Sequence, residues 1–374
     1  MLKALSQHRH PHLVKLLATF EYQGAYYLLF PWAKANLRTY WKGTPLPQFS
    51  TDTVMWLLRQ CKGIASGLLR IHGYQTTHDY TTEQSLARRG RSTSDISIDG
   101  RLYGRHGDIK PENILWTDED IMDEERRPCE EGLLLLADFG LMRIHRELTK
   151  SLVNPESVTG SPTYEPPELK LHAKVSRAYD IWSLGCVYLE FLTWLIGGWD
   201  ELDRFSPARS ITGLDGTNDD TFFTLVDVEG SSHRTAVVRG SVQQWINDLD
   251  EKPECSDFIH EFLHLISTEM LIIDPQARIH CGHLNERLSD MLRRAKADPE
   301  YLTRRTPSDI NSAPVSAFSG YRKRPSLPTS REEGFPLPRR AATARSSAAA
   351  ARMQPQSPAS IGWQYTSAPS SPKP

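Results

Sequence analysis

One polar loop constrains the fold of this chain more than any other feature of its sequence. It reads His106-Gly107-Asp108-Ile109-Lys110-Pro111-Glu112-Asn113, with an Asp, a Lys two positions later and an Asn five positions later. An apolar run over 133–137 follows, and it leads into Asp138-Phe139-Gly140. An ordinary solvated loop and turn are the alternative interpretation, which the joint spacing of the two clusters disfavours.

Three further motifs follow in order. They are Gly160-Ser161-Pro162-Thr163-Tyr164-Glu165-Pro166-Pro167-Glu168, then Asp180-Ile181-Trp182-Ser183-Leu184-Gly185, then Asp274-Pro275 with Arg278. The five motifs together resemble the catalytic loop, the DFG turn and the later motifs of eukaryotic protein kinases. Each is weak alone, but five in the right order are a strong signal. The resemblance covers about residues 1–296 and favours the Ser/Thr-specific branch, which Lys110 and Ser161 suit.

This resemblance implies an α+β, protein-kinase-like fold with a mainly helical large lobe and a truncated β-rich small lobe. The implied parts are a partial small lobe at 1–40, a large lobe at 41–296 with insertions at 75–105 and 117–131, and a disordered tail at 297–374. Periodicity predicts helices at Thr53–His72, Asp180–Trp194, Val242–Leu249 and Cys255–Met270, and strands at Leu13–Leu17 and Tyr26–Phe30.

The tail differs from the rest of the chain in composition and charge. From Thr303 onward there are eleven Lys/Arg and three Asp/Glu, a balance of +8, which leaves −10 for the first 302 residues. Rich in Ser, Pro and Ala, this segment buries too little apolar area to offset the entropy of ordering it. We therefore expect an acidic folded body and a basic, disordered tail.

The resemblance assigns chemical roles to the loop residues, because phosphoryl transfer needs an aligned hydroxyl, metal ions and charge compensation. Asp108 is the catalytic base that orients the substrate hydroxyl, and Lys110 neutralises the transferring phosphate. Asn113 and Asp138 hold Mg²⁺, for which carboxylate and amide oxygens are suitable ligands. A hydroxyl such as that of Ser161 typically bridges the catalytic Asp and Lys.

Further residues are implied to bind ATP or to hold the site in shape. The ATP contacts are Phe30, Trp32, Ala33 and Leu115, in addition to Asn113 and Asp138. The supporting residues are His106, Phe139, Gly140, Ser161, Glu168, Asp180 and Arg278, with Glu168 and Arg278 forming a pair. Residues 30–33 would be the hinge whose backbone binds adenine, although Pro31 offers no N–H; the edge of a core strand is the alternative.

Two departures from the family pattern bear on activity. The sequence contains no G-x-G, so the Gly-rich loop of the family is absent. In the family, a helix of the small lobe carries a Glu that pairs with the ATP-binding Lys. The stretch Met1-Leu2-Lys3-Ala4-Leu5 looks like the end of that helix. We therefore predict an N-terminally incomplete chain of a Ser/Thr kinase; a catalytically dead scaffold that binds protein partners is the alternative. Gly107 stands where most kinases have Arg, which suggests that activity does not depend on an activation-segment phosphate.

The sequence also limits the partners and the compartment. Protein substrates are expected, because residues 160–168 resemble a peptide-positioning segment, and nucleic acid is disfavoured because the tail lacks interleaved aromatics. Five dispersed Cys without a C-x-x-C pair predict a reducing compartment, cytoplasmic or nuclear. The apolar run over 181–196 contains Glu190 and is short for a membrane span, so a buried helix is predicted.

Overall fold

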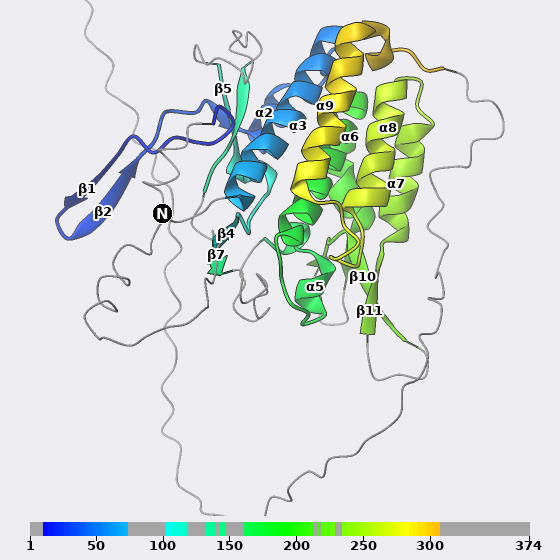
Figure 1. The fold of residues 1–374 in the computed structure, drawn as a ribbon. Helices are drawn as coiled ribbons and strands as arrows, with labels where there is room; N and C mark the ends of the chain where they lie inside the picture. The colour runs from blue at the N-terminus through cyan, green and yellow to red at the C-terminus, as the bar shows by residue number, and fades with distance from the viewer. Residues whose placement is uncertain are drawn as a thin grey trace, which may run out of the picture. The chain divides into compact units, whose positions relative to one another are not determined.

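The fold is α+β, with a mainly helical large lobe. The structure is a computed structural model. It describes residues 10–73, 102–118, 132–138, 143–146, 161–212, 216, 218–228 and 234–306. Its α-helices are α2 (Leu37–Gly43), α3 (Thr51–His72), α5 (Pro167–Lys170), α6 (Ala178–Arg209), α7 (Gly240–Asp250), α8 (Asp257–Leu265) and α9 (Cys281–Ala297). In Figure 1, α3, α9, α6, α8 and α7 run side by side.

The strands are β1 (Ala18–Tyr22), β2 (Ala25–Leu29), β3 (Ala35–Asn36), β4 (Leu102–Arg105), β5 (Ile114–Thr117), β6 (Leu133–Leu136), β7 (Arg143–Arg146), β8 (Ile211–Thr212), β9 (Asn218–Asp219), β10 (Phe223–Asp227) and β11 (Arg234–Val238). They form small sheets: β3-β5-β6 has three strands, and β1-β2, β4-β7, β8-β9 and β10-β11 are antiparallel pairs.

Helix α3 shows how the sequence specifies the large lobe. Its N-cap Ser50 accepts a hydrogen bond from the Thr53 N–H, as short polar side chains do at helix starts. Its buried positions recur every three or four residues, so one face packs on the core. The prediction of a helix over Thr53–His72 is confirmed, with a start two residues earlier.

Helix α6 forms the centre of the core. Every residue from Tyr179 to Leu195 is buried. The helix is long and apolar enough to cross a membrane by those criteria alone, but 89% of its most apolar window is buried inside the protein. It extends to Arg209, well beyond the predicted Trp194, because Gly198, with a φ of 73°, lets the chain bend and continue as a helix.

The two N-terminal strands form a hairpin that is exposed on both faces. Gln23 and Gly24, with φ of 51° and 76°, make the two-residue turn that the twist of a hairpin favours. The predicted strand Leu13–Leu17 is wrong: Leu13 bridges Leu136, and the Val14 N–H donates to the Leu136 carbonyl at 2.9 Å. Leu13 and Val14 therefore lie along β6, whereas the Leu17 N–H donates to the Leu29 carbonyl at 2.8 Å, at the base of the hairpin that begins at Ala18.

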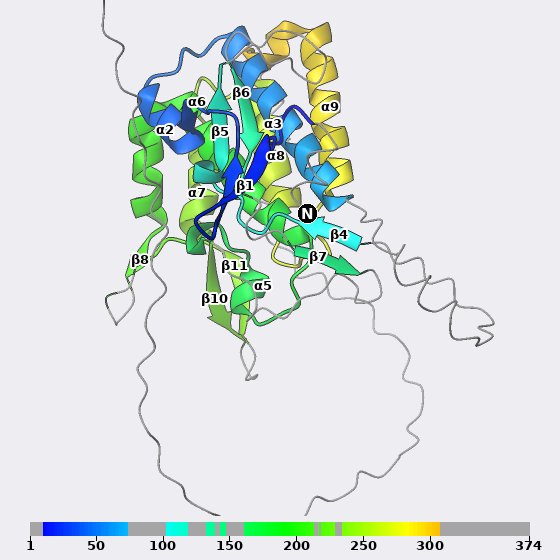
Figure 2. The ribbon, with the colours of Figure 1, turned by 90° about the vertical axis from the view of Figure 1, so that its left-hand side faces the viewer.

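The catalytic-loop sequence lies between two ladders. Strand β4 pairs with β7 and leads into the loop, while β5 leaves it and pairs with β6, which runs toward Asp138 (Figure 2). The segment 75–105 was predicted as a flexible insertion, and this is wrong for its last four residues, which form β4. Cross-strand pairing with residues 143–146, which the sequence pattern does not reveal, orders them.

The C-terminal helices α7 and α8 match the predicted segments, and α8 continues as a π-helical turn, η7 (Ile266–Met270). The predicted tail boundary at 297 is wrong. A 3-10 turn, η8 (Pro299–Leu302), buries Tyr301 and Leu302, and the Tyr301 hydroxyl donates to Glu261 at 2.8 Å. The predicted disordered tail beyond 306 lies outside the described residues.

Candidate active site

A buried carboxylate at the start of α6 fixes the backbone of the loop. Asp180 is fully buried and accepts hydrogen bonds from the His106 and Gly107 N–H groups, both at 2.9 Å, and from His72 Nε2 at 2.8 Å. Burial acts to raise the pKa of this carboxyl, but the hydrogen bond and charge of His72 and the Gly107 N–H outweigh it. The pKa of Asp180 therefore lies below its ordinary value, and the group is a carboxylate.

Gly107 has a φ of 85°, a conformation that glycine adopts readily and other residues adopt at a cost. The family usually has Arg at this position. A glycine here suits the backbone turn that directs the N–H groups of His106 and Gly107 toward the Asp180 carboxylate.

His106 connects the loop to the segment that leads to Asp138. Its Nε2 donates to the Ala137 carbonyl at 3.0 Å, and its Nδ1 accepts from the Asp108 N–H at 3.3 Å. This pairing requires a neutral ring, and burial lowers the pKa of His106 accordingly, against the raising effect of Asp180. The predicted stacking partner Phe139 and the turn residue Gly140 lie outside the described residues.

Asp108 lies at the centre of a polar cluster. Its Oδ1 accepts from the Ser161 N–H at 3.1 Å and from Ser161 Oγ at 3.0 Å. Lys110 Nζ donates to Ser161 Oγ at 2.6 Å and lies 2.9 Å from Asp108 Oδ2. The structure thus brings Asp108, Lys110 and Ser161 together from segments about 50 residues apart in the chain, with the hydroxyl between the carboxylate and the ammonium group.

Asn113 and Asp138 suit the demands of a magnesium ion bound with a nucleotide. The Asn113 amide nitrogen donates to the Asp108 carbonyl and to Oδ2, both at 2.9 Å, which directs its Oδ1 away from Asp108. The Ala137 N–H donates to the Asn113 carbonyl at 2.9 Å and so holds the start of the Asp138 turn beside Asn113. Asp138, exposed and with a φ of 60°, adopts a left-handed conformation that Asp tolerates better than most residues. In magnesium sites where phosphate and water supply the other ligands, the protein commonly contributes one or two oxygen ligands, such as one carboxylate and one amide oxygen.

The residues predicted to contact adenine occupy varied environments. Phe30 and Leu115 are half-buried and pack against the core, and Ala33 is half-buried on the segment between β2 and β3. Trp32 is 68% exposed, so its side chain faces solvent. The Lys34 N–H donates to the Trp116 carbonyl at 3.1 Å, which joins this segment to β5 close to Leu115.

The predicted pair of Glu168 and Arg278 forms in the core. Two hydrogen bonds of 3.0 and 3.1 Å join the guanidinium and the carboxylate, whose side chains are 0% and 1% exposed. Arg278 also donates to the Ile272 and Ala178 carbonyls and lies over the Trp182 ring. The pair ties the segment around Glu168 to the helical core.

A network beside the loop was missed by sequence reasoning. Arg38, in the first turn of α2, donates to Glu112 at 3.2 Å, to Glu190 at 3.3 Å and to the Tyr164 hydroxyl, which itself donates to Glu190 at 2.9 Å. These residues are far apart in the chain, and no local pattern pairs them. The charged Glu190 in an otherwise apolar run was the one signal that a buried partner was needed.

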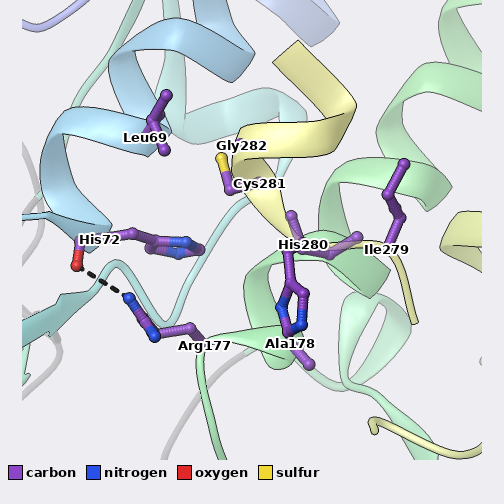
Figure 3. Close-up of a pocket in the computed structure, with 9 residues that line it drawn as sticks. Leu69, His72, Arg177, Ala178, Ile279, His280, Cys281 and Gly282 are labelled. Carbon is purple, nitrogen blue, oxygen red and sulfur yellow. Dashed lines mark hydrogen bonds between the residues drawn. The ribbon is translucent and has the colours of Figure 1, made fainter. Parts of the chain in front are cut away.

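A hollow of about 260 Å³ lies elsewhere, between α3, α6 and the start of α9 (Figure 3). Its lining includes the polar residues His72, Arg177 and His280 and the apolar residues Leu69, Ile181 and Ile279. Arg177 donates to the His72 carbonyl at 3.2 Å, as the dashed line in Figure 3 shows. No residue of the catalytic loop lines this hollow.

Comparisons with known proteins agree with this geometry. The family model described as protein kinase domain matches residues 104–287. Among similar curated proteins, cyclin-dependent kinase 4 of Xenopus laevis is 28% identical over 221 residues, covering 57% of this chain and 54% of the relative. Cyclin-dependent kinase 4 of Ovis aries is 26% identical over 226 residues, covering 59% of each chain. MAP3K epsilon protein kinase 1 of Arabidopsis thaliana is 41% identical over 88 residues, 24% of this chain and 5% of the relative. The chain spans just over half the length of the cyclin-dependent kinases that it matches.

Proposed function

Residues 104–287 belong to the protein kinase domain family, and from this premise we propose that the protein transfers a phosphoryl group from Mg-ATP to Ser or Thr hydroxyls of other proteins. The observation that carries the proposal is the cluster in which Ser161 Oγ lies between Asp108 and Lys110. A carboxylate, an ammonium group and an amide oxygen gathered beside one another are the groups that this reaction requires.

Each residue has a definite task in this proposal. Asp108 accepts the hydrogen bond of the substrate hydroxyl and orients its oxygen toward the phosphate. Lys110 offsets the charge that develops on the transferring group. Asn113 Oδ1 and the Asp138 carboxylate would hold Mg²⁺, which neutralises the ATP phosphates when it is bound. Ser161 positions Asp108 and Lys110, and Phe30, Ala33 and Leu115 supply apolar surface for adenine, with the backbone near Trp32.

The activity test compares Asp108→Asn with the unchanged protein in transfer of labelled γ-phosphate from ATP to acceptor proteins. Removing a positioned base is expected to slow transfer by about 10²–10⁴-fold. Asp52→Asn, an exposed position in the first turn of α3, is the matched control and should transfer phosphate at the original rate. Equal transfer by the Asp108 variant and the unchanged protein would contradict the assignment.

A second candidate function is a non-catalytic scaffold, which the exposed β1–β2 hairpin favours. Phe20, Tyr27 and Tyr26 are 52%, 43% and 82% exposed, and such aromatic surface is typical of protein-binding sites. Thermal unfolding with and without Mg-ATP separates the candidates, since a ligand that binds the native state raises the melting temperature by an amount set by its affinity. A shift that is lost in Asp138→Asn supports the kinase, whereas no shift favours the scaffold.

We also infer protein substrates and an intracellular location, cytoplasmic or nuclear. The four described cysteines, Cys61, Cys186, Cys255 and Cys281, are free and buried, which is compatible with a reducing compartment.

A further inference from the structure

The hollow between α3, α6 and the start of α9 is large enough to hold a small molecule. Its volume is about 260 Å³, and Gly282, in the first turn of α9, forms part of its lining. Apart from the chain neighbours of Gly282 and the backbone of its own helix, a Cβ atom added there would meet no described atom within 4 Å. A cavity of about 150 Å³ holds a benzene molecule. This hollow therefore has room for a ring that carries a short side chain.

The lining of the hollow combines apolar surface with positive charge. Its apolar part includes three aliphatic side chains, Leu69, Ile181 and Ile279. Arg177 contributes a permanent positive charge and His280 an imidazole, and no Asp or Glu is among the described residues that line the hollow. Cys281 adds no negative charge, because burial raises the pKa of its thiol, which donates to the Ala65 carbonyl at 3.4 Å. A ligand of this hollow is therefore partly apolar and carries a negative charge.

The Arg177 guanidinium determines which charged group fits best. It is half-buried and donates to the His72 carbonyl at 3.2 Å, which holds it at the wall of the hollow (Figure 3). The planar fork of a guanidinium matches the geometry of carboxylates and phosphates. Because the Asp180 carboxylate lies directly behind the His72 ring, a ligand with a single negative charge is repelled less than a phosphate dianion. The lining thus favours a carboxylate joined to a small apolar group.

One wall of the hollow leads to the catalytic loop through two side chains. The His72 ring extends into the hollow from the last turn of α3, and its Nε2 donates to Asp180 at 2.8 Å (Figure 3). The same carboxylate accepts hydrogen bonds at 2.9 Å from the His106 and Gly107 N–H groups, which immediately precede Asp108. A ligand packed on the His72 ring restricts its motion, so the hydrogen bonds that share the carboxylate open less often.

We propose that the hollow binds a small amphipathic carboxylate, and that this binding steadies the backbone at the start of the catalytic loop. The carboxylate pairs with Arg177, and the apolar group packs on the aliphatic side chains of the lining. A charge-assisted pair of this kind favours the charged ligand over a neutral analogue of the same shape by roughly tenfold or more. Binding in the hollow is measured without phosphate transfer, so the result does not depend on the proposed function.

The binding test compares 3-phenylpropionate with 3-phenylpropionamide, its neutral counterpart of nearly the same shape. Isothermal titration calorimetry on the full chain gives the Kd of each probe. We expect the carboxylate to bind about tenfold more tightly than the amide, and this ratio to fall to about one in Arg177→Gln. Arg204→Gln, at a Arg on α6 whose side chain is 73% exposed, is the control for loss of one positive charge and should keep the ratio. Equal affinities for the two probes in the unchanged protein, or binding of neither, would overturn the inference.

A second variant fills the hollow itself. Gly282→Phe places a ring in the space that the ligand would occupy, and it should weaken binding of 3-phenylpropionate by about tenfold or more. Gly240→Phe is the matched control, because Gly240 begins α7 and a Cβ atom added there also meets nothing within 4 Å in the described part of the chain. Undiminished binding in Gly282→Phe would show that the probe binds elsewhere and would contradict the proposal. Circular dichroism and thermal unfolding verify that each variant is folded.

Hydrogen exchange measures the link to the catalytic loop. Mass spectrometry follows exchange in peptides that span residues 102–113, with and without saturating 3-phenylpropionate. The probe should slow exchange of the His106 and Gly107 amides by roughly threefold or more, because both donate to Asp180. The same probe should have no effect on these amides in Gly282→Phe. Binding that leaves exchange in 102–113 unchanged would refute the link between the hollow and the loop.

Discussion

Replacing Asp180 by Asn tests whether one buried carboxylate holds the catalytic loop in place. The carboxylate accepts hydrogen bonds on both oxygens: Oδ2 from the His106 N–H and His72, and Oδ1 from the Gly107 N–H. Asn keeps one oxygen and turns an NH₂ group toward a donor. The change removes at least one hydrogen bond to a charged group, leaves a buried N–H unpaired and weakens the remaining bonds. We expect a loss of about 3 kcal/mol.

Urea unfolding at neutral pH measures this loss, since a native domain is stable by only about 5–15 kcal/mol. Asp200→Asn, exposed on the same helix, is the matched control and should change stability by less than about 0.5 kcal/mol. A loss below about 1 kcal/mol in the Asp180 variant, at an unchanged slope, would refute the reasoning. The variant should also transfer phosphate more slowly, because His106 and Gly107 lead directly into Asp108.

The pH dependence gives a second measurement on the same pair of proteins. The folded-state pKa of Asp180 lies below its ordinary value, so the carboxylate stabilises the native state fully above about pH 4. As the pH falls through the folded-state pKa, the native protein must bind the proton and the stabilisation is lost. The unchanged protein and Asp180→Asn should therefore converge in stability at strongly acid pH, whereas a constant difference would show that the carboxylate charge is irrelevant.

Two further predictions concern the supports of the loop. Arg278→Ala leaves the Glu168 carboxylate buried and unpaired, and thermal unfolding should show a loss of about 3–5 kcal/mol, against almost none for the exposed Arg293→Ala. Equal effects of the two Arg changes would contradict the buried-pair argument. Gly107→Ala forces a side chain into a φ of 85° and should cost about 1 kcal/mol in urea unfolding, whereas Gly43→Ala, in open space at the end of α2, should cost nothing. Similar stabilities for the two Gly variants would show that the positive φ is not strained.

The helices and the polar loop could be predicted from the sequence because their signals are local. Helix α3 has an N-cap at Ser50 and regular apolar spacing, so its limits were found within two residues. The loop at 106–113 and the Glu168–Arg278 pair were recognised from motifs whose residues do meet in the structure.

The errors arose where distant segments decide the local structure. Residues 102–105 become a strand only because residues 143–146 lie beside them, and Leu13 is held by Leu136. The partners of Glu190 come from α2 and from Tyr164, and the burial of Leu302 depends on the helical core. Sequence periodicity reports which face of an element is apolar, but not which element will cover it.

The central position of α6 has a consequence for how the protein is made. Synthesis proceeds from the N-terminus, so α3 is available early, and the Tyr188 hydroxyl can reach the Cys61 carbonyl soon after α6 emerges. The contacts of Trp182 with Arg278 must wait until the ribosome has translated much of the remaining domain. Between the synthesis of α6 and that of the Arg278 segment, the nascent chain exposes an apolar helix whose length and composition match a membrane span. Because exposed apolar surface promotes aggregation, chaperone binding during translation should govern the yield of folded protein.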